Sequence, residues 1–357
     1  MKIGIVGLPK SGKTTIYSLL IQGGKSPAPG EPHVGVVKVP DPRLDYLARL
    51  FQPKKVTSAT VEFHDFLGLT KGAGKGEGLG GQYISQLRLM DALLEVVRAF
   101  EDSRIPHPEG SLNPLRDVAA LEAEFLFADL EVVVKRLERI EEAFRKGKKE
   151  EYLQERDILQ RCKEKLEADV PLRDVEFAEE ERRLLRGFQF LTSKPLILLV
   201  NRGEELVKES PAFAKLKGLA AHRGTSLLEL NGKVELELAE LSPEEAEEFR
   251  REMGLPEAGR PRLIQACYEL LRLITFYTFV GEEVRAWTIP KGTSALKAAG
   301  TIHTDMERGF IKAEVLNFED LKESGSLPAA KKKGLLHLEG KDYLVADGDL
   351  LTIRFHV

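Results

Sequence analysis

Cysteine and long apolar runs are scarce in this sequence. Its 357 residues include two cysteines, which lie far apart and show no spacing typical of a metal or redox site. A disulfide framework is therefore not expected, and this is typical of a reducing compartment. After Met1 the chain reads KIGIVGLP, without a basic segment before an apolar one. No run approaches the roughly 18 apolar residues of a membrane span. We therefore expect a cytoplasmic protein with no membrane segment.

An excess of charge of one sign is also missing. The chain has 53 basic and 57 acidic residues, which give a formal net charge of −4 at pH 7. This balance neither requires nor excludes a nucleic-acid partner, because only a local basic face could indicate one. The length allows two or three domains, and a hydrophobic content of 42% allows each a core.

The most informative stretch lies near the amino terminus. Residues 2–6 have the composition of a short buried strand, residues 7–14 read G-x-x-x-x-G-K-T, and residues 15–20 have helical apolar spacing. This order of strand, glycine loop and helix is that of a phosphate-binding loop, whose N–H groups face an anion. Lys13 would place its charge on the β- and γ-phosphates and support catalysis, and Thr14 would offer a hydroxyl to Mg²⁺. The predicted phosphate-binding residues of this loop are Gly7, Lys10, Ser11, Gly12, Lys13, Thr14 and Thr15.

A second segment supplies an acidic residue for the metal. In ATVEFHD, apolar and polar residues alternate as in a strand, and Asp65 ends the run, with Gly68 completing the pattern D-x-x-G. An aspartate at this place can hold Mg²⁺, and the glycine N–H can meet the γ-phosphate. The pattern alone is common, and an ordinary turn is the alternative. After a phosphate-binding loop, it predicts that Thr14 and Asp65 hold the metal and that Gly68 contacts phosphate.

The segment after D-x-x-G raises the question of the catalytic group. Residues 71–81 contain six glycines, too many for a stable helix or strand interior. We interpret them as a loop ordered by the γ-phosphate, with a flexible linker as the alternative.

Many GTPases orient the attacking water with a glutamine where this chain has Leu69. His107, between two prolines, is a candidate for that role, although a lone loop histidine is more often solvated.

The base end of the site is expected where another strand ends. Apolar residues 196–200 precede Asn201, Arg202 and Glu204, at the place of the Asn-Lys-x-Asp of GTPases. Ligands of parallel α/β sheets bind at the carboxyl ends of the strands. Glu204 adds a methylene to the aspartate that reads guanine, whereas the Asn201 amide can pair with adenine N6 and N7. The segment thus favours ATP over GTP, and a simple turn is the alternative. The predicted base-contacting residues are Asn201, Arg202, Glu204, Asn231 and Gly232.

Several segments together resemble one protein family. GLPKSGKTT, KGAGKGEGLGGQYI, VVRAFED, NRGE and EVRAWTIPKGTSALKAAGTIHTDMERGFIKAEV are similar to segments of the YchF/Obg-like ATPases, and the resemblance covers nearly the whole chain. It implies an α/β P-loop NTPase fold with a mostly parallel sheet and flanking helices, a helical coiled-coil insertion and a C-terminal β-grasp (TGS) domain. It also implies an ATPase that prefers ATP to GTP and associates with the ribosome, through rRNA or a ribosomal protein. From the site residues we expect hydrolysis to be slow and to depend on Mg²⁺. A hydrophobic residue at the place of Leu69 and a catalytic histidine at the place of His107 are family features.

One segment departs from the family. Members carry a threonine before Glu-Pro and GVV that can ligand Mg²⁺, and Pro29 stands at that place here. Because proline has no hydroxyl, the first switch and the turnover rate are in question. Leu69 and Pro29 leave open a nucleotide-gated ribosome-binding module with negligible turnover, and a conventional GTPase is the other alternative. We expect a monomer.

The rest of the chain predicts two further parts. Apolar residues recur at intervals of four and three over residues 126–144 and mark a heptad seam, and residues 159–166 share one face of a returning helix. We therefore expect a helical arm over residues 114–190, inserted into an NTPase domain over residues 1–275. From there short strands alternate with turns, which predicts a β-grasp domain over residues 276–357.

Overall fold

The chain forms two compact units. The computed structural model describes residues 1–21, 33–66, 79–147, 149–203, 211–219, 224–255 and 257–356. One unit contains residues 1–36 and 62–266, and the other contains residues 37–61 and 267–357. The second unit thus begins before the expected boundary at residue 276 and takes in a segment of the N-terminal part. Four residues of the sequence predictions lie outside the described residues, namely Pro29, Gly68, Leu69 and Glu204.

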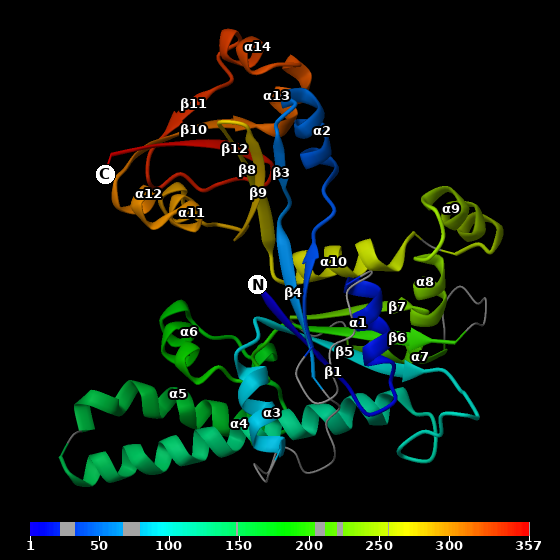
Figure 1. Ribbon diagram of the computed structural model, residues 1–357. Coiled ribbons are helices and arrows are strands. Elements are labelled where there is room, and N and C mark those ends of the chain that lie inside the picture. Colours follow the sequence, from blue (N-terminus) through cyan, green and yellow to red (C-terminus); the bar gives the residue numbers. More distant parts are fainter. Residues whose placement is uncertain are drawn as a thin grey trace. The chain divides into compact units, whose positions relative to one another are not determined.

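A mostly parallel sheet organises the first unit (Figure 1). Its strands, in the described residues, run in the order β2-β4-β1-β5-β6-β7. Their bounds are β1 Lys2–Val6, β2 His33–Lys38, β4 Thr60–Asp65, β5 Ala92–Ala99, β6 Leu196–Arg202 and β7 Thr225–Leu230. The pairs from β4 to β7 are all parallel. Strand β5 is buried along almost its whole length, as expected for a strand covered on both faces. This sheet confirms the predicted α/β P-loop fold.

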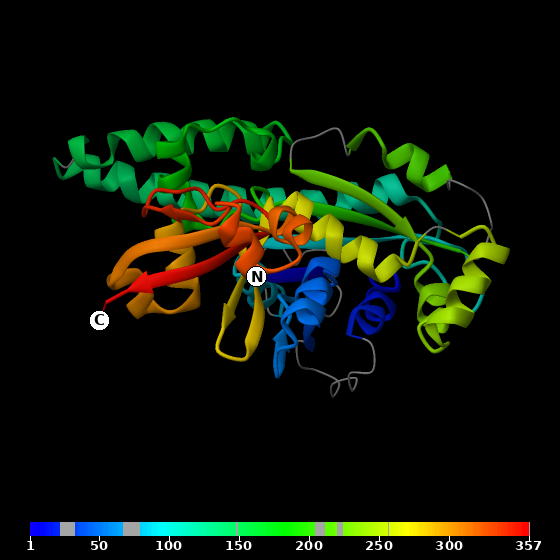
Figure 2. The same ribbon diagram turned by 90° about the horizontal axis from the view of Figure 1, so that it is seen from above.

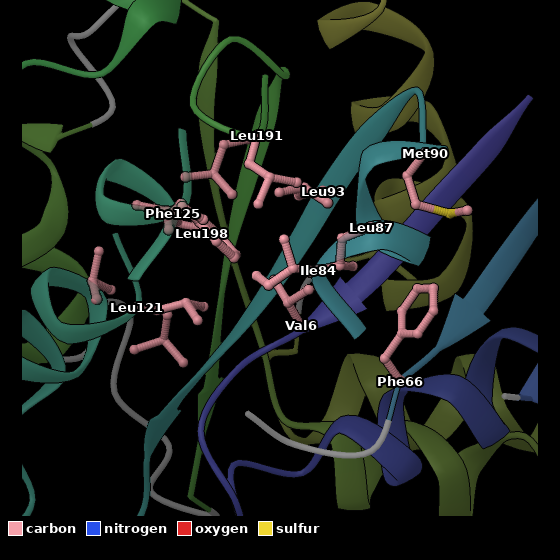
Figure 3. Packing of buried hydrophobic residues seen from close by; sticks show 14 of the residues in the cluster. Val6, Phe66, Ile84, Leu87, Met90, Leu93, Leu121, Phe125, Leu191 and Leu198 are labelled. Carbon is pink, nitrogen blue, oxygen red and sulfur yellow. The ribbon is translucent and has the colours of Figure 1, made fainter. Parts of the chain in front are cut away.

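Helices flank this sheet. They are α1 Lys13–Ile21, α3 Leu79–Arg88, α7 Pro211–Leu216, α8 Gly232–Leu238, α9 Pro243–Glu252 and α10 Gly259–Leu270. A core cluster joins α3, β5 and β6 to the first helix of the arm, and Figure 3 shows Leu87, Leu93, Phe125 and Leu198 within it. Gly80 and Gly81, expected in a loop, lie in the first turn of α3 instead. That turn can form because Ile84 and Leu87, further along the helix, are buried in the same cluster.

The insertion between β5 and β6 is helical. It contains α4 Pro114–Arg145, α5 Lys149–Glu167 and α6 Glu179–Leu185. Helices α4 and α5 lie side by side (Figures 1 and 2). The predicted heptad seam is confirmed, since its residues form one apolar cluster with the returning helix: Leu126, Leu130, Val133, Leu137, Ile140, Phe144, Leu159, Cys162 and Leu166. None of the described helices is both long and apolar enough to cross a membrane.

The second unit has a sheet of its own, in the order β11-β10-β12-β8-β9-β3. Its strands are β3 Lys55–Thr57, β8 Leu273–Val280, β9 Glu283–Pro290, β10 Phe310–Asn317, β11 His337–Glu339 and β12 Asp349–Phe355. Its helices are α2 Pro42–Phe51, α11 Ala295–Ile302, α12 Thr304–Arg308, α13 Phe318–Ser324 and α14 Leu327–Lys332. Strand β3 pairs in parallel with β9, and α2 contributes Leu44 and Leu47 to the same core as Tyr277. A segment expected in the NTPase domain therefore belongs to this core.

Candidate nucleotide-binding site

The glycine loop between β1 and α1 is closed tightly. Gly7 and Gly12 have φ values of 142° and 97°, which side chains rarely adopt. A Cβ on Gly7 would lie 2.6 Å from the carbonyl oxygen of Val96 in β5, and one on Gly12 would lie 2.2 Å from Asn201 Nδ2. The two glycines therefore allow the loop to lie close to β5 and β6.

Lys13 is buried at the floor of this loop. Its Nζ donates hydrogen bonds to the carbonyl oxygens of Gly7, at 3.0 Å, and Leu8, at 2.8 Å. Burial lowers the pKa of Lys13 to about 8, and the nearby Asp65 carboxylate opposes this shift. The ammonium group thus lies against polar atoms of its own loop, where a phosphate oxygen would be a stronger partner.

The two predicted metal ligands lie together. The Thr14 side chain hydrogen-bonds to the Asp65 carboxylate, which lies at the end of β4. Burial raises the pKa of Asp65, and the charges of Lys13 and His33 act in the opposite direction. His33 Nδ1 lies 3.9 Å from Asp65 Oδ2. A cavity of about 340 Å³ opens here, lined by Pro9, Lys10, Gly12, Lys13, Thr14, Thr15, Asp65 and Phe66.

This donor set fits Mg²⁺. Both side chains offer oxygen, the ligand atom that Mg²⁺ prefers. Across the described residues, no group of three or more His, Cys, Asp and Glu side chains could hold a metal ion. A cation at Thr14 and Asp65 would therefore complete its shell with phosphate and water, which is the usual way in which Mg²⁺ is bound with nucleotides.

A second cavity, of about 750 Å³, adjoins the glycine loop at the other end. It brings together five predicted site residues, namely Gly12, Thr15, Asn201, Arg202 and Asn231. Its lining also includes Phe100, Arg104, Lys233 and Leu236, which sequence reasoning missed. Phe100 directly follows β5, so its place at a strand end was a usable signal. Leu236 lies one turn into α8 and carries no such signal.

Asn201 is a structural link within the site. Its side chain is buried, Nδ2 donates to the Ser11 carbonyl oxygen at 3.0 Å, and Oδ1 accepts from the Gly232 N–H at 3.0 Å. The amide therefore joins the phosphate loop to the start of α8. One N–H and one lone pair of the amide are left for a base.

The other predicted base-contacting residues have structural partners too. Arg202 Nη1 lies 3.8 Å from Glu229 Oε2 on the adjacent strand β7. The Asn231 side-chain oxygen caps α8 by accepting from the N–H groups of Lys233 and Val234. These contacts place both side chains at the cavity wall in defined orientations.

Two residues of the phosphate loop have distinct environments. Lys10 is exposed, and its Nζ donates to the carbonyl oxygen of Pro106 at 3.4 Å. The Ser11 hydroxyl is buried and has no hydrogen-bond partner in the part of the chain that the structure describes. Through Lys10, the phosphate loop contacts the segment that carries His107.

His107 is not the solvated loop residue that its sequence context favours. Its side chain is 6% exposed, and Nε2 lies 2.9 Å from Asp117 Oδ2. The N–H of Glu109 donates to Nδ1 at 3.1 Å. Both ring nitrogens are thus occupied, and His107 does not line either cavity among the described residues.

Comparisons with known proteins identify the family. The family model YchF-GTPase_C, described as "Protein of unknown function (DUF933)", matches residues 273–356. The "Ribosome-binding ATPase YchF" of Bacillus subtilis (strain 168) is 42% identical over 99% of both chains. The "Obg-like ATPase 1" of Oryza sativa subsp. japonica is 36% identical, over 100% of this chain and 92% of its own.

Solved structures agree with this relationship. The Schizosaccharomyces pombe YchF GTPase matches with a TM-score of 0.86 at 33% identity, over 99% of this chain and 97% of its own. A GTP-binding protein from Pyrococcus horikoshii OT3 matches with a TM-score of 0.62 at 18% identity over the full length of both chains, which shows the shared fold. The full-length relatives confirm the resemblance seen in the motifs, and this chain belongs to the YchF family of Obg-like P-loop NTPases.

Proposed function

We propose that this chain is a slow, Mg²⁺-dependent ATPase that binds ATP in preference to GTP and acts in association with the ribosome. The observation that carries the proposal is the pair of cavities on either side of Gly12 and Thr15. One is lined by Lys13 and Asp65, and the other by Asn201 at the end of β6. Phosphates and base would therefore meet different, chemically suited walls of one site.

The residues of the phosphate end have separable roles. The Thr14 hydroxyl and the Asp65 carboxylate would hold Mg²⁺, which when bound neutralises charge on the β- and γ-phosphates. Lys13 and the loop N–H groups would stabilise the charge that develops on the transferring phosphoryl. Lys10, Ser11 and Gly68 complete the proposed phosphate contacts, and His107 is the proposed group that positions water.

At the base end, the hydrogen-bonding groups favour adenine over guanine, whereas the apolar surface suits either purine. Phe100 and Leu236 offer apolar surface to any purine. Glu204 replaces the aspartate that suits guanine, and the Asn201 amide keeps one N–H for a base. The relatives from Bacillus subtilis and rice are named as ATPases, and the former as ribosome-binding. We propose the same for this chain, as a cytoplasmic monomer.

The fission yeast relative is named a GTPase, and this favours GTP hydrolysis as a second candidate function. Calorimetric titration with ATP and GTP side by side separates the two. We expect ATP to bind on the order of tenfold more tightly, because one good base contact is worth about 1–3 kcal/mol. Tighter binding of GTP would reject the base assignment.

Phosphate release measured in single turnovers, with and without ribosomes, tests the ATPase itself. We expect slow release that depends on Mg²⁺ and is abolished in Lys13→Ala. Release that stays at background in the presence of Mg²⁺ and ribosomes would instead support a nucleotide-gated binding module. Co-sedimentation with ribosomes at saturating ATP checks the proposed partner, and a chain that stays in the supernatant would contradict it.

A further inference from the structure

The loop that carries His107 is held at its start and in its middle. At its start, Arg98 of β5 donates from Nε to the Phe100 carbonyl oxygen at 3.1 Å and from Nη2 to that of Ile105 at 2.7 Å. In the middle, Lys10 of the phosphate loop reaches Pro106, the residue before the histidine. The backbone next to His107 is thus already beside the phosphate site.

The histidine ring itself is turned to other partners. Because the Glu109 N–H donates to Nδ1, the ring proton is assigned to Nε2, which donates to Asp117 Oδ2 at 2.9 Å. The side chains of His107 and Asp117 are each only 6% exposed. In this arrangement no ring nitrogen is left to accept a proton from water or to orient it.

Asp117 belongs to the helical arm. It lies in the first turn of α4, and its Oδ1 accepts from Nε and Nη2 of Arg116, at 3.1 and 2.8 Å. Arg116 also donates to the backbone and side-chain oxygens of Ser111, which precedes the helix. The carboxylate is therefore fixed by the start of α4, and its contact with His107 joins the arm to the loop beside the phosphate site.

We propose that Asp117 is a positioning residue that withholds His107 from the phosphate site, and that displacement of the first turn of α4 releases the histidine. This inference rests on the proposed role of His107 in ATP hydrolysis. An aspartate that activates a histidine contacts one ring nitrogen and leaves the other free for the reaction. Here the other nitrogen is also bonded, within the same loop, so the contact restrains the ring.

Hydrolysis by the full-length chain in single turnovers, with Mg²⁺ and saturating ATP, tests the proposal. Asp117→Ala should accelerate phosphate release on the order of tenfold, since a hydrogen bond to a charged group stabilises the withheld state by a factor of that order. His107→Ala should slow release, and His107→Ala combined with Asp117→Ala should be as slow as His107→Ala alone. Asp157→Ala is the control, because it removes an exposed arm carboxylate paired with Arg156 and should leave the rate unchanged.

Imidazole ¹⁵N spectra give a second readout that does not need ATP. The His107 signals, assigned by their loss in His107→Ala, should show the Nε2–H tautomer with a hydrogen bond to a carboxylate in the parent, and the Nε2 signal should shift as that bond is lost in Asp117→Ala. Asp117→Asn keeps the shape of the side chain and guards against a folding defect. It should give a smaller acceleration, because a neutral amide oxygen holds the ring less strongly.

The outcomes separate this proposal from the proposed function. Suppose that the parent hydrolyses ATP and that both Asp117 variants release phosphate at the parental rate or more slowly. The proposal that Asp117 restrains His107 is then wrong, and the ATPase assignment stands. If the ¹⁵N signals of His107 are the same in the parent and Asp117→Ala, the contact does not hold the ring and the proposal also fails. If no variant or parent releases phosphate, the ATPase assignment and the restraint fall together.

Discussion

Asn201 shows how one side chain can serve structure and recognition at once. Its amide has a donor bonded to the phosphate loop and an acceptor bonded to the N–H of Gly232. The sequence suggested only a base-reading role, because a motif names a residue type but not its hydrogen-bond partners. Both bonds lie in buried surroundings, so a residue without an amide would leave a carbonyl and an N–H group unsatisfied.

We therefore expect Asn201→Ala to lower the free energy of unfolding by about 2–6 kcal/mol, at about 1–3 kcal/mol for each unsatisfied group. Affinity for both ATP and GTP should fall, because the variant loosens the phosphate loop that both nucleotides share, and ATP should lose more, because its proposed base contact with the amide is also removed. Urea denaturation and calorimetry measure the two effects. Asn231→Ala is the matched control, since it removes a helix cap on the same cavity and should cost about 1 kcal/mol. A loss confined to ATP would show that base reading dominates.

Among the elements, α8 connects the base end of the site to the helices behind it. Its Glu235 is buried and accepts from Nη1 and Nη2 of Arg250 in α9, at 3.0 and 2.7 Å. The same carboxylate accepts from the N–H of Gly259, the first residue of α10, at 3.0 Å. Because Leu236 of α8 lines the base cavity, this network fixes one of the cavity walls.

Glu235→Ala should destabilise the first unit by about 3–5 kcal/mol, because it removes the buried carboxylate that pairs with the Arg250 charge and accepts from the Gly259 N–H. ATP affinity should fall as well, since α8 would lose its support. Glu248→Ala on α9 is the comparison. Its carboxylate is exposed and lies 3.9 Å from Arg251, so its loss should change stability by less than about 1 kcal/mol. Equal effects of the two substitutions in urea denaturation would contradict this role for Glu235.

Elements whose signal is local were predictable from the sequence. Strand β1 was expected over its observed residues, and the capping box of Ser242 and Glu245 at the start of α9 is a signal of the same local kind. The seam between α4 and α5 was also predictable, since a heptad pattern predicts that its apolar face packs against another helix. The contact of His107 with Asp117 was not, because it depends on where a loop folds back onto a helix. Periodicity carries no information about such a contact.

At the scale of the whole molecule, the chain passes between the two units more than once. Strands β2 and β4 each contain residues of both units, and the segment between them, residues 37–61, adds α2 and β3 to the second unit. Leu44 and Leu47 show helical apolar spacing, but the sequence does not say which core they enter. A boundary drawn from changes of composition therefore missed this segment, and the family model that begins at residue 273 does not include it.

The second unit should accordingly fold better with this segment than without it. Leu44 is 4% exposed and Leu47 is fully buried, and both pack in the core that contains Tyr277. Two buried leucines contribute about 3–6 kcal/mol, a large part of the stability of a small domain.

We expect residues 37–61, fused through a flexible linker to residues 267–357, to unfold cooperatively in urea. Residues 267–357 alone should be less stable by at least about 3 kcal/mol. The fusion carrying Leu47→Asp keeps the same length and linker and should behave like the fragment alone. Equal midpoints for the fusion and the fragment would show that α2 and β3 are not part of this core in solution.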